Sequence, residues 1–157
     1  MSSTPTPPEY VYGGARAMVA LHDTEMRRFL EVWKRARAAD LPLGETKDRD
    51  YASLEHLLIH VLACAAGYMR WMCEVLELEV PDMPKPPEPE EAAAVADEYL
   101  ERALALWRDP LAGVEEERFY RPEHASRWKT LYCVDSMLEH AVMHPIRHRY
   151  QLEQMLG

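Results

Sequence analysis

Five prolines between Pro81 and Pro89 divide this 157-residue chain, because no helix can run through them. Each proline lacks the amide hydrogen that a helix needs, and its ring clashes with the preceding turn. We therefore expect a stiff, extended connector at this point. A connector of this length can carry the chain along the whole domain, so the segments that it joins need not pack as a hairpin.

On either side of the connector, glycine and proline separate segments whose apolar residues recur at helical spacing. A first helix is expected over residues 13–39, and a second runs from a cap at Asp48 or Asp50 to about residue 79. A third covers 89–109, with proline and acidic residues in its first turn, and a fourth covers about 131–156. The sequence predicts an all-α four-helix bundle with a long proline-rich connection between its second and third helices.

The remaining segments are expected to be irregular. Residues 1–12 are rich in serine, threonine and proline, which predicts a disordered lead before a single domain at 13–157. Residues 113–129 are expected to form a loop anchored by Phe119, Tyr120 and Trp128. No segment has the alternating pattern of a strand.

Composition excludes several classes of function. A formal net charge of -9 argues against a nucleic-acid partner, which needs a concentrated basic surface. No apolar run approaches the roughly 20 residues that span a bilayer, and no signal-peptide pattern is present. The cysteines, Cys64, Cys73 and Cys133, lack CxxC spacing and predict free buried thiols. These features predict a cytoplasmic protein without a membrane partner.

The most informative motif is a repeated histidine ladder. Leu-Glu-His-Leu-Leu-Ile-His at 54–60 returns as Leu-Glu-His-Ala-Val-Met-His at 138–144, and the second copy continues to His148. Because residues four apart lie on one helix face, each ladder forms a row of imidazoles. Their angles to the apolar stripes place His60, His144 and His148 on the inner side, and His56 and His140 further out.

Three neutral imidazoles with an open coordination position suit zinc, and also nickel or iron. Each ring needs a partner for its second nitrogen, and the candidates are Glu55, Glu139, Gln151 and Tyr68. The alternative is partly buried histidines that bond only to carbonyls, but the repeated spacing favours a metal.

Cys64 follows one turn after His60, as either a fourth ligand, a reactive thiol or, more simply, a small core residue. Pro145 predicts a kink in the last helix.

Other metal sites fit the sequence less well. The zinc-protease pattern HExxH needs a glutamate where Leu57 and Ala141 stand. Di-iron bundles need Glu-x-x-His, and neither Glu55 nor Glu139 is followed by such a histidine. Haem bound by one histidine from each helix remains a further hypothesis, and a Soret band on haem titration would test it.

The pattern resembles the DinB/YfiT-like superfamily of bacterial four-helix proteins. The matching elements are His60 within Leu-Ile-His-Val, followed by Tyr68, and the segment His-Pro-Ile-Arg-His-Arg-Tyr-Gln at 144–151, which is similar to that family's HxxxHxxQ pattern. The resemblance extends over about 15–156. The chain departs from many relatives in having Ala63 and Cys64 where they carry an acidic residue.

The resemblance implies a divalent metal ion at His60, His144 and His148, a homodimer, and either hydrolysis or transfer of a low-molecular-weight thiol to a small-molecule substrate. The expected enzyme would use the metal to lower the pKa of water or thiol, with Glu55, Glu139 or Tyr68 relaying protons. The rival hypothesis is a non-catalytic, stress-associated scaffold whose metal is structural or absent. An open site beside a pocket would favour the enzyme.

Overall fold

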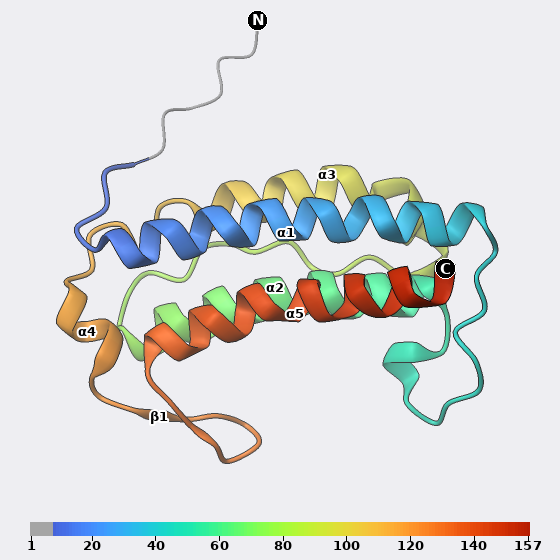
Figure 1. The fold of residues 1–157 in the computed structure, drawn as a ribbon. Helices are drawn as coiled ribbons and strands as arrows, with labels where there is room; N and C mark the ends of the chain where they lie inside the picture. The colour runs from blue at the N-terminus through green and yellow to red at the C-terminus, as the bar shows by residue number, and fades with distance from the viewer. Residues whose placement is uncertain (1–7) are drawn as a thin grey trace, which may run out of the picture.

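The computed structural model describes residues 8–157, and within them four long helices pack along one another (Figure 1). These are α1 (Gly13–Ala38), α2 (Leu54–Val75), α3 (Pro89–Trp107) and α5 (Val134–Leu156). Shorter elements are the 3-10 helix η1 (Arg49–Tyr51), α4 (Glu116–Tyr120) and the strands β1 (His124–Ala125) and β2 (Leu131–Tyr132). The predicted all-α bundle is confirmed.

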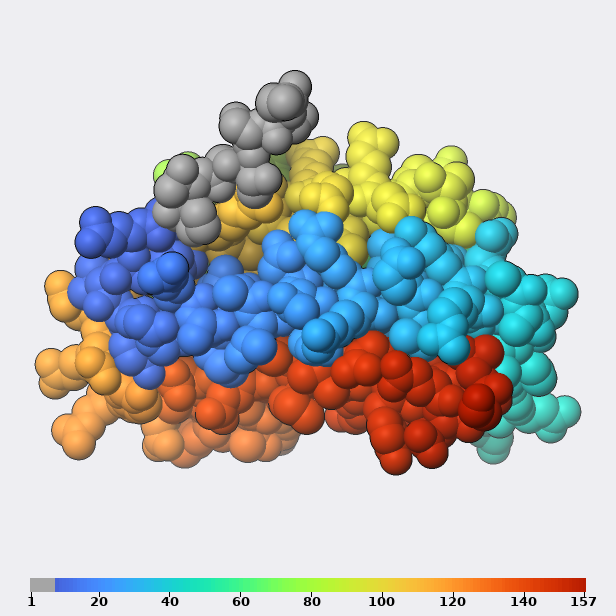
Figure 2. Space-filling model, turned by 45° about the horizontal axis from the view of Figure 1, so that its top comes forward, coloured from blue at the N-terminus to red at the C-terminus, as the bar shows by residue number. Residues whose placement is uncertain are grey.

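The first and last long helices run side by side in the same direction, and α2 and α3 run the opposite way (Figure 1). The space-filling view shows α1 lying between α3 and α5 over the full length of one face (Figure 2). The extended segment after α2 returns along the bundle before α3 begins at Pro89, as the prolines predict. Consequently α2 and α3 are parallel neighbours rather than a hairpin.

The segment 113–129 differs from the predicted loop, and the prediction that the chain holds no strand was wrong. The last helix begins at Val134 rather than near residue 131, and β2 stands in the first positions predicted for it. Residues 113–133 form α4 and a small antiparallel hairpin in which His124 pairs with Tyr132 and Ala125 with Leu131. Two-residue strands are too short to show an alternating pattern, which explains the error. Of the expected anchors, Phe119 is fully buried, whereas Tyr120 and Trp128 are about half exposed.

The boundaries of α2 also need correction. Its N-cap is Ser53, whose hydroxyl accepts a hydrogen bond from the amide of His56 at 3.2 Å, and not Asp48 or Asp50. Asp48 instead caps η1. The helix ends at Val75 rather than near residue 79, because Glu77 has a positive φ of 56° that ends the helical backbone.

Part of the predicted disordered lead belongs to the folded domain. The hydroxyl of Tyr10 donates to the carbonyl of Arg108 at 2.6 Å, and the amide of Val11 donates to the carbonyl of Ala112 at 2.9 Å. Residues 8–12 are thereby tied to the end of α3. The rest of the predicted lead, residues 1–7, lies outside the described residues.

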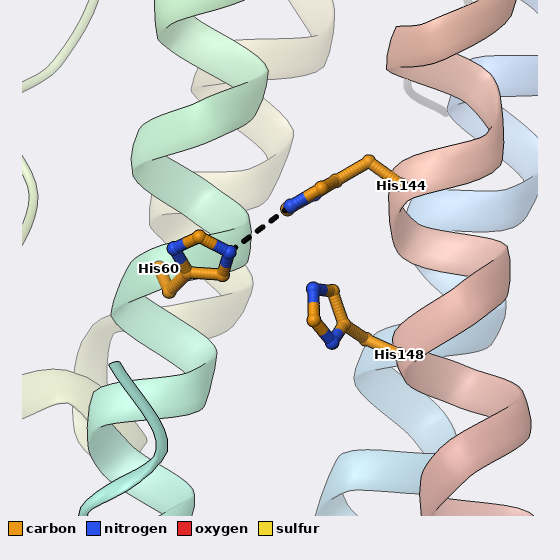
Figure 3. Close-up of side chains that lie close together, drawn as sticks. All are labelled: His60, His144 and His148. Atoms are coloured by element: carbon orange, nitrogen blue, oxygen red, sulfur yellow. Dashed lines mark hydrogen bonds between the residues drawn. The ribbon is translucent and has the colours of Figure 1, made fainter. Parts of the chain in front are cut away.

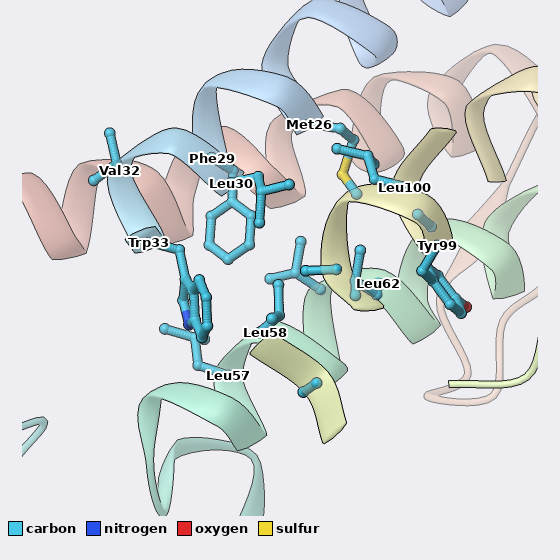
Figure 4. Close-up of a cluster of buried hydrophobic side chains, with 14 of the residues drawn as sticks. Met26, Phe29, Leu30, Val32, Trp33, Leu57, Leu58, Leu62, Tyr99 and Leu100 are labelled. Atoms are coloured by element: carbon cyan, nitrogen blue, oxygen red, sulfur yellow. The ribbon is translucent and has the colours of Figure 1, made fainter. Parts of the chain in front are cut away.

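Two apolar clusters form the core and fix α2 against its neighbours. Figure 4 shows side chains of α1, α2 and α3 meeting in one of them, with Phe29, Trp33 and Leu58 fully buried. Trp33 donates its indole hydrogen to the carbonyl of Leu54 at 2.6 Å, and Trp107 donates to that of Ala65 at 3.0 Å. Among the helices of residues 8–157, none combines the length and apolar character that a bilayer crossing requires.

Candidate metal centre

His60 on α2 and His144 and His148 on α5 turn their rings toward one another in the space between these two helices (Figure 3). One ring nitrogen of each lies within 4.8 Å of the others. The Nε2 atoms of His60 and His144 are 3.1 Å apart, and the ring centroids of His144 and His148 are 4.7 Å apart. The inner set expected from helix geometry is thus the set that the fold brings together.

The outer nitrogens of two of these rings are held by acceptors. Nδ1 of His148 lies 3.0 Å from Oε1 of Gln151, and Nδ1 of His60 lies 3.1 Å from a carboxylate oxygen of Asp50. An acceptor at Nδ1 selects the tautomer that carries its proton there, which leaves a lone pair on Nε2. Both rings therefore direct a lone pair toward the centre of the cluster.

The charge state of the rings also suits a cation. Burial, and after it repulsion from the neighbouring cationic groups, lowers the pKa of His144 to about 2. Burial likewise lowers the pKa of His148 to about 4, although its bond to Gln151 opposes the shift. Both imidazoles are neutral at pH 7 and able to act as ligands.

One polar atom at the cluster is left without a partner. Nε2 of His148 is buried and forms no hydrogen bond within residues 8–157. A buried lone pair without a partner costs free energy, and a metal ion at the centre would satisfy it. The donor set and this atom together fit a divalent cation that prefers nitrogen ligands, such as zinc, nickel or iron.

The cluster opens onto a cavity of about 1000 Å³. His60 and His144 line it, as do Tyr51 of η1, Tyr68 and Trp71 of α2, and Trp128 in the turn of the hairpin. A cavity of this size holds a small organic molecule. The cluster is therefore reachable by a substrate.

The sequence-predicted proton relays lie in different places. Tyr68 lines the cavity, and its ring centroid is 5.7 Å from that of His144. Glu55 instead faces α1, with a carboxylate oxygen 3.5 Å from Nε of Arg37, and Glu139 is exposed on α5. Neither of these two carboxylates lines the cavity.

The outer histidines and Cys64 have other surroundings. Nδ1 of His56 lies 2.9 Å from the hydroxyl of Ser53, and His140 stacks on Trp128 with centroids 5.6 Å apart. Sγ of Cys64 approaches the outer nitrogen of His60 at 3.8 Å, away from the centre. Burial raises the pKa of this thiol, so it is not an activated thiolate.

Sequence reasoning missed the contribution of η1. Asp50 was considered only as a helix cap, but it bonds His60, and the ring of Tyr51 lies 5.7 Å from that of His148. Both residues precede α2 in an irregular connection, where apolar periodicity gives no direction. Asp50 precedes His60 by ten residues and lies outside its helix, so helical spacing does not point to it; the available signal is only that a metal-bound imidazole needs an acceptor at its second nitrogen.

Comparison with known proteins identifies the family. No curated protein and no solved structure matches the chain. The sequence model of the DinB family matches residues 21–157, which include most of α1, the other three long helices and the three clustered histidines. The chain belongs to the DinB family.

Proposed function

We propose that this protein is a metal-dependent enzyme in which His60, His144 and His148 hold a divalent metal ion beside a substrate cavity. One observation carries the proposal: three imidazoles from two helices converge, and two of them, His60 and His144, line an open cavity of about 1000 Å³. A structural site needs no such access, because its ligands usually enclose the metal. The open cavity therefore favours an enzyme over a scaffold.

The residues around the cluster would have separate tasks. When bound, the metal acts as a Lewis acid that lowers the pKa of water or of a low-molecular-weight thiol. Asp50 and Gln151 orient the rings of His60 and His148. Burial raises the pKa of Tyr68 well above its usual value, so its hydroxyl keeps its proton at neutral pH and can donate it to a substrate. Tyr68 is the proposed proton donor, in preference to Glu55 and Glu139.

Two reactions share this arrangement, namely hydrolysis and transfer of a low-molecular-weight thiol to an electrophile. They differ in the nucleophile, and turnover assays with and without added thiol separate them. The homodimer implied by the family resemblance is part of the same proposal, and sedimentation velocity tests it.

The test of the metal site is elemental analysis of protein purified without a histidine tag or a nickel column. We expect about one zinc, nickel or iron per chain. The variant His144→Ala should lose the metal and keep its helical circular dichroism. The matched control is His56→Ala, which removes a histidine of the other ladder that lies outside the cluster and should keep its metal. Stoichiometric metal in folded His144→Ala, or none in the reconstituted wild type, would reject the site.

A further inference from the structure

One part of the cavity wall is built from aromatic rings. Trp128 lies in the turn of the β1–β2 hairpin, and its ring contacts three others, with centroid distances of 5.6 Å to Tyr132, 5.6 Å to His140 and 6.0 Å to Trp71. Trp71 also contacts Tyr132 at 5.5 Å. The rings come from α2, the hairpin and α5, so three separate segments meet in this aromatic wall.

Trp128 remains 49% exposed in spite of these contacts, and it lines the cavity. An indole that neighbouring rings hold in place, with much of its surface in water, presents an apolar surface without losing conformational freedom on binding. A planar ring placed against it would bury that surface. Trp128 therefore has the features of a binding residue rather than of a core anchor.

The aromatic wall is connected to the histidine cluster. The ring of Tyr68 lies 5.3 Å from that of His140, which stacks on Trp128, and 5.7 Å from that of His144. A molecule seated on the wall would therefore lie beside the candidate metal centre. The wall is a subsite of the same cavity and not a separate surface.

Two arginines lie near the wall. Arg127 and Arg147 line the cavity, and neither forms an ion pair within residues 8–157. Burial and then the charge of Arg147 lower the pKa of His140. Arg49 and Arg70 also line the cavity, and so do four carboxylates, namely Asp48, Asp50, Glu74 and Glu88. Glu74 follows Trp71 by three residues on α2, whereas the other three carboxylates lie at the starts of η1 and α3.

We propose that the cavity selects small aromatic molecules that carry an anionic group, with the ring on Trp128 and Trp71 and the anion facing Arg127 and Arg147. As a statement about an enzyme's substrate, this rests on the proposed function. The binding itself depends on residues outside the histidine cluster, so it can be measured independently of metal and turnover.

The experiment is isothermal titration calorimetry of the full chain with 2-naphthoate, using cyclohexanecarboxylate and 2-naphthalenemethanol as comparison probes. We expect 2-naphthoate to bind at least about tenfold more tightly than either probe, since only it offers both ring and charge.

Trp128→Leu keeps apolar bulk without the ring and should weaken naphthoate binding about tenfold. Arg147→Gln should weaken naphthoate and leave 2-naphthalenemethanol unchanged. Tyr150→Ala, an exposed aromatic of α5 outside this cavity, is the matched control.

Equal naphthoate affinity in wild type and folded Trp128→Leu, or equal affinity for naphthoate and cyclohexanecarboxylate, would overturn the inference. Measuring the metal content of the wild type alongside naphthoate binding separates this inference from the proposed function. Trp128-dependent naphthoate binding in a wild-type protein without metal would support the subsite while the metal site fails. Metal in the wild type together with naphthoate binding that ignores Trp128 would support the metal site and overturn the subsite.

Discussion

Two regions of the bundle contain buried histidines, and only one of them has the geometry of a site. His22 of α1 is 1% exposed, and burial lowers its pKa to about 3. Its ring stacks on Trp107 with centroids 3.6 Å apart and planes 10° from parallel, and neither of its nitrogens has a partner within residues 8–157. His144 and His148 are similarly buried and similarly neutral, but one ring nitrogen of each converges with a ring nitrogen of His60.

The difference shows that burial and a lowered pKa do not by themselves indicate a function. His22 lies alone between the two apolar clusters, so its ring acts as a flat core side chain with two unsatisfied nitrogens. In the three-histidine cluster, neighbouring acceptors select the tautomer, and a second helix supplies the opposing ring. We expect changes near His22 to alter stability and changes near the cluster to alter metal binding.

The largest effect is expected for Trp107→Ala. The change removes a fully buried indole, its stacking on His22 and its hydrogen bond to Ala65, and should lower the free energy of unfolding by about 3–5 kcal/mol. Urea denaturation measures this. Trp128→Ala, a half-exposed indole, should cost far less. Metal lost from Trp107→Ala while it is still folded would show that the two regions are not separate.

The variant His22→Phe should change how stability depends on pH. Because the folded-state pKa of His22 lies below the usual 6.5, unfolding takes up a proton as the pH falls below that value. The wild type should therefore lose up to about 1.4 kcal/mol per pH unit from this group between pH 6 and 4. The phenylalanine variant lacks the group, so its advantage over the wild type should grow as the pH falls.

This comparison uses urea denaturation of metal-free protein at several pH values between 4 and 7. Subtracting the wild-type free energy from that of the variant removes the contributions of all histidines that the two proteins share. A difference that stays constant with pH would show that His22 is not the group responsible.

On the side of the cluster, Asp50→Ala should weaken metal binding about 10–100-fold, because the carboxylate that orients His60 is lost. Competition with a chromophoric chelator measures the affinity. Stability should change little, since the carboxylate is 54% exposed. Glu74→Ala is the control, because Glu74 also lines the cavity and bonds none of the three histidines. Equal affinity in Asp50→Ala and wild type would remove Asp50 from the site.

The smallest effect is expected for Ser53→Ala at the start of α2. Loss of the N-cap should lower the free energy of unfolding by about 1 kcal/mol, while the metal content stays the same. Ser53→Asp keeps a capping oxygen and should restore the stability in the same urea assay. Loss of metal in Ser53→Ala would mean that the helix cap also holds His60 in position.

Much of this architecture could be predicted from the sequence because long helices repeat their pattern many times. The four helices, the connector beginning at Pro81 and the family follow from spacing and motif. The ladder also selected His60, His144 and His148, since each lies at the edge of an apolar stripe and must turn inward when the stripes pack.

The features that were missed depend on contacts between segments rather than on repeats. Asp50 reaches His60 from a three-residue turn, and Trp128 reaches Trp71 and His140 from a short hairpin. The same limit applies to His22, because nothing in its neighbouring residues reveals that Trp107 will cover its ring. The pattern of neighbouring residues does not predict which distant side chain a residue will contact in the folded protein.

The pairing of the first and last helices has a consequence for synthesis on the ribosome. The apolar face of α1 stays uncovered on one side until α5 emerges, since these helices are neighbours in the finished bundle. His60 likewise has no His144 beside it until 84 further residues have been synthesised. A nascent chain that ends before Val134 therefore lacks both the last helix of the core and two of the three clustered imidazoles, so neither the core nor the histidine cluster can be completed before α5 has emerged.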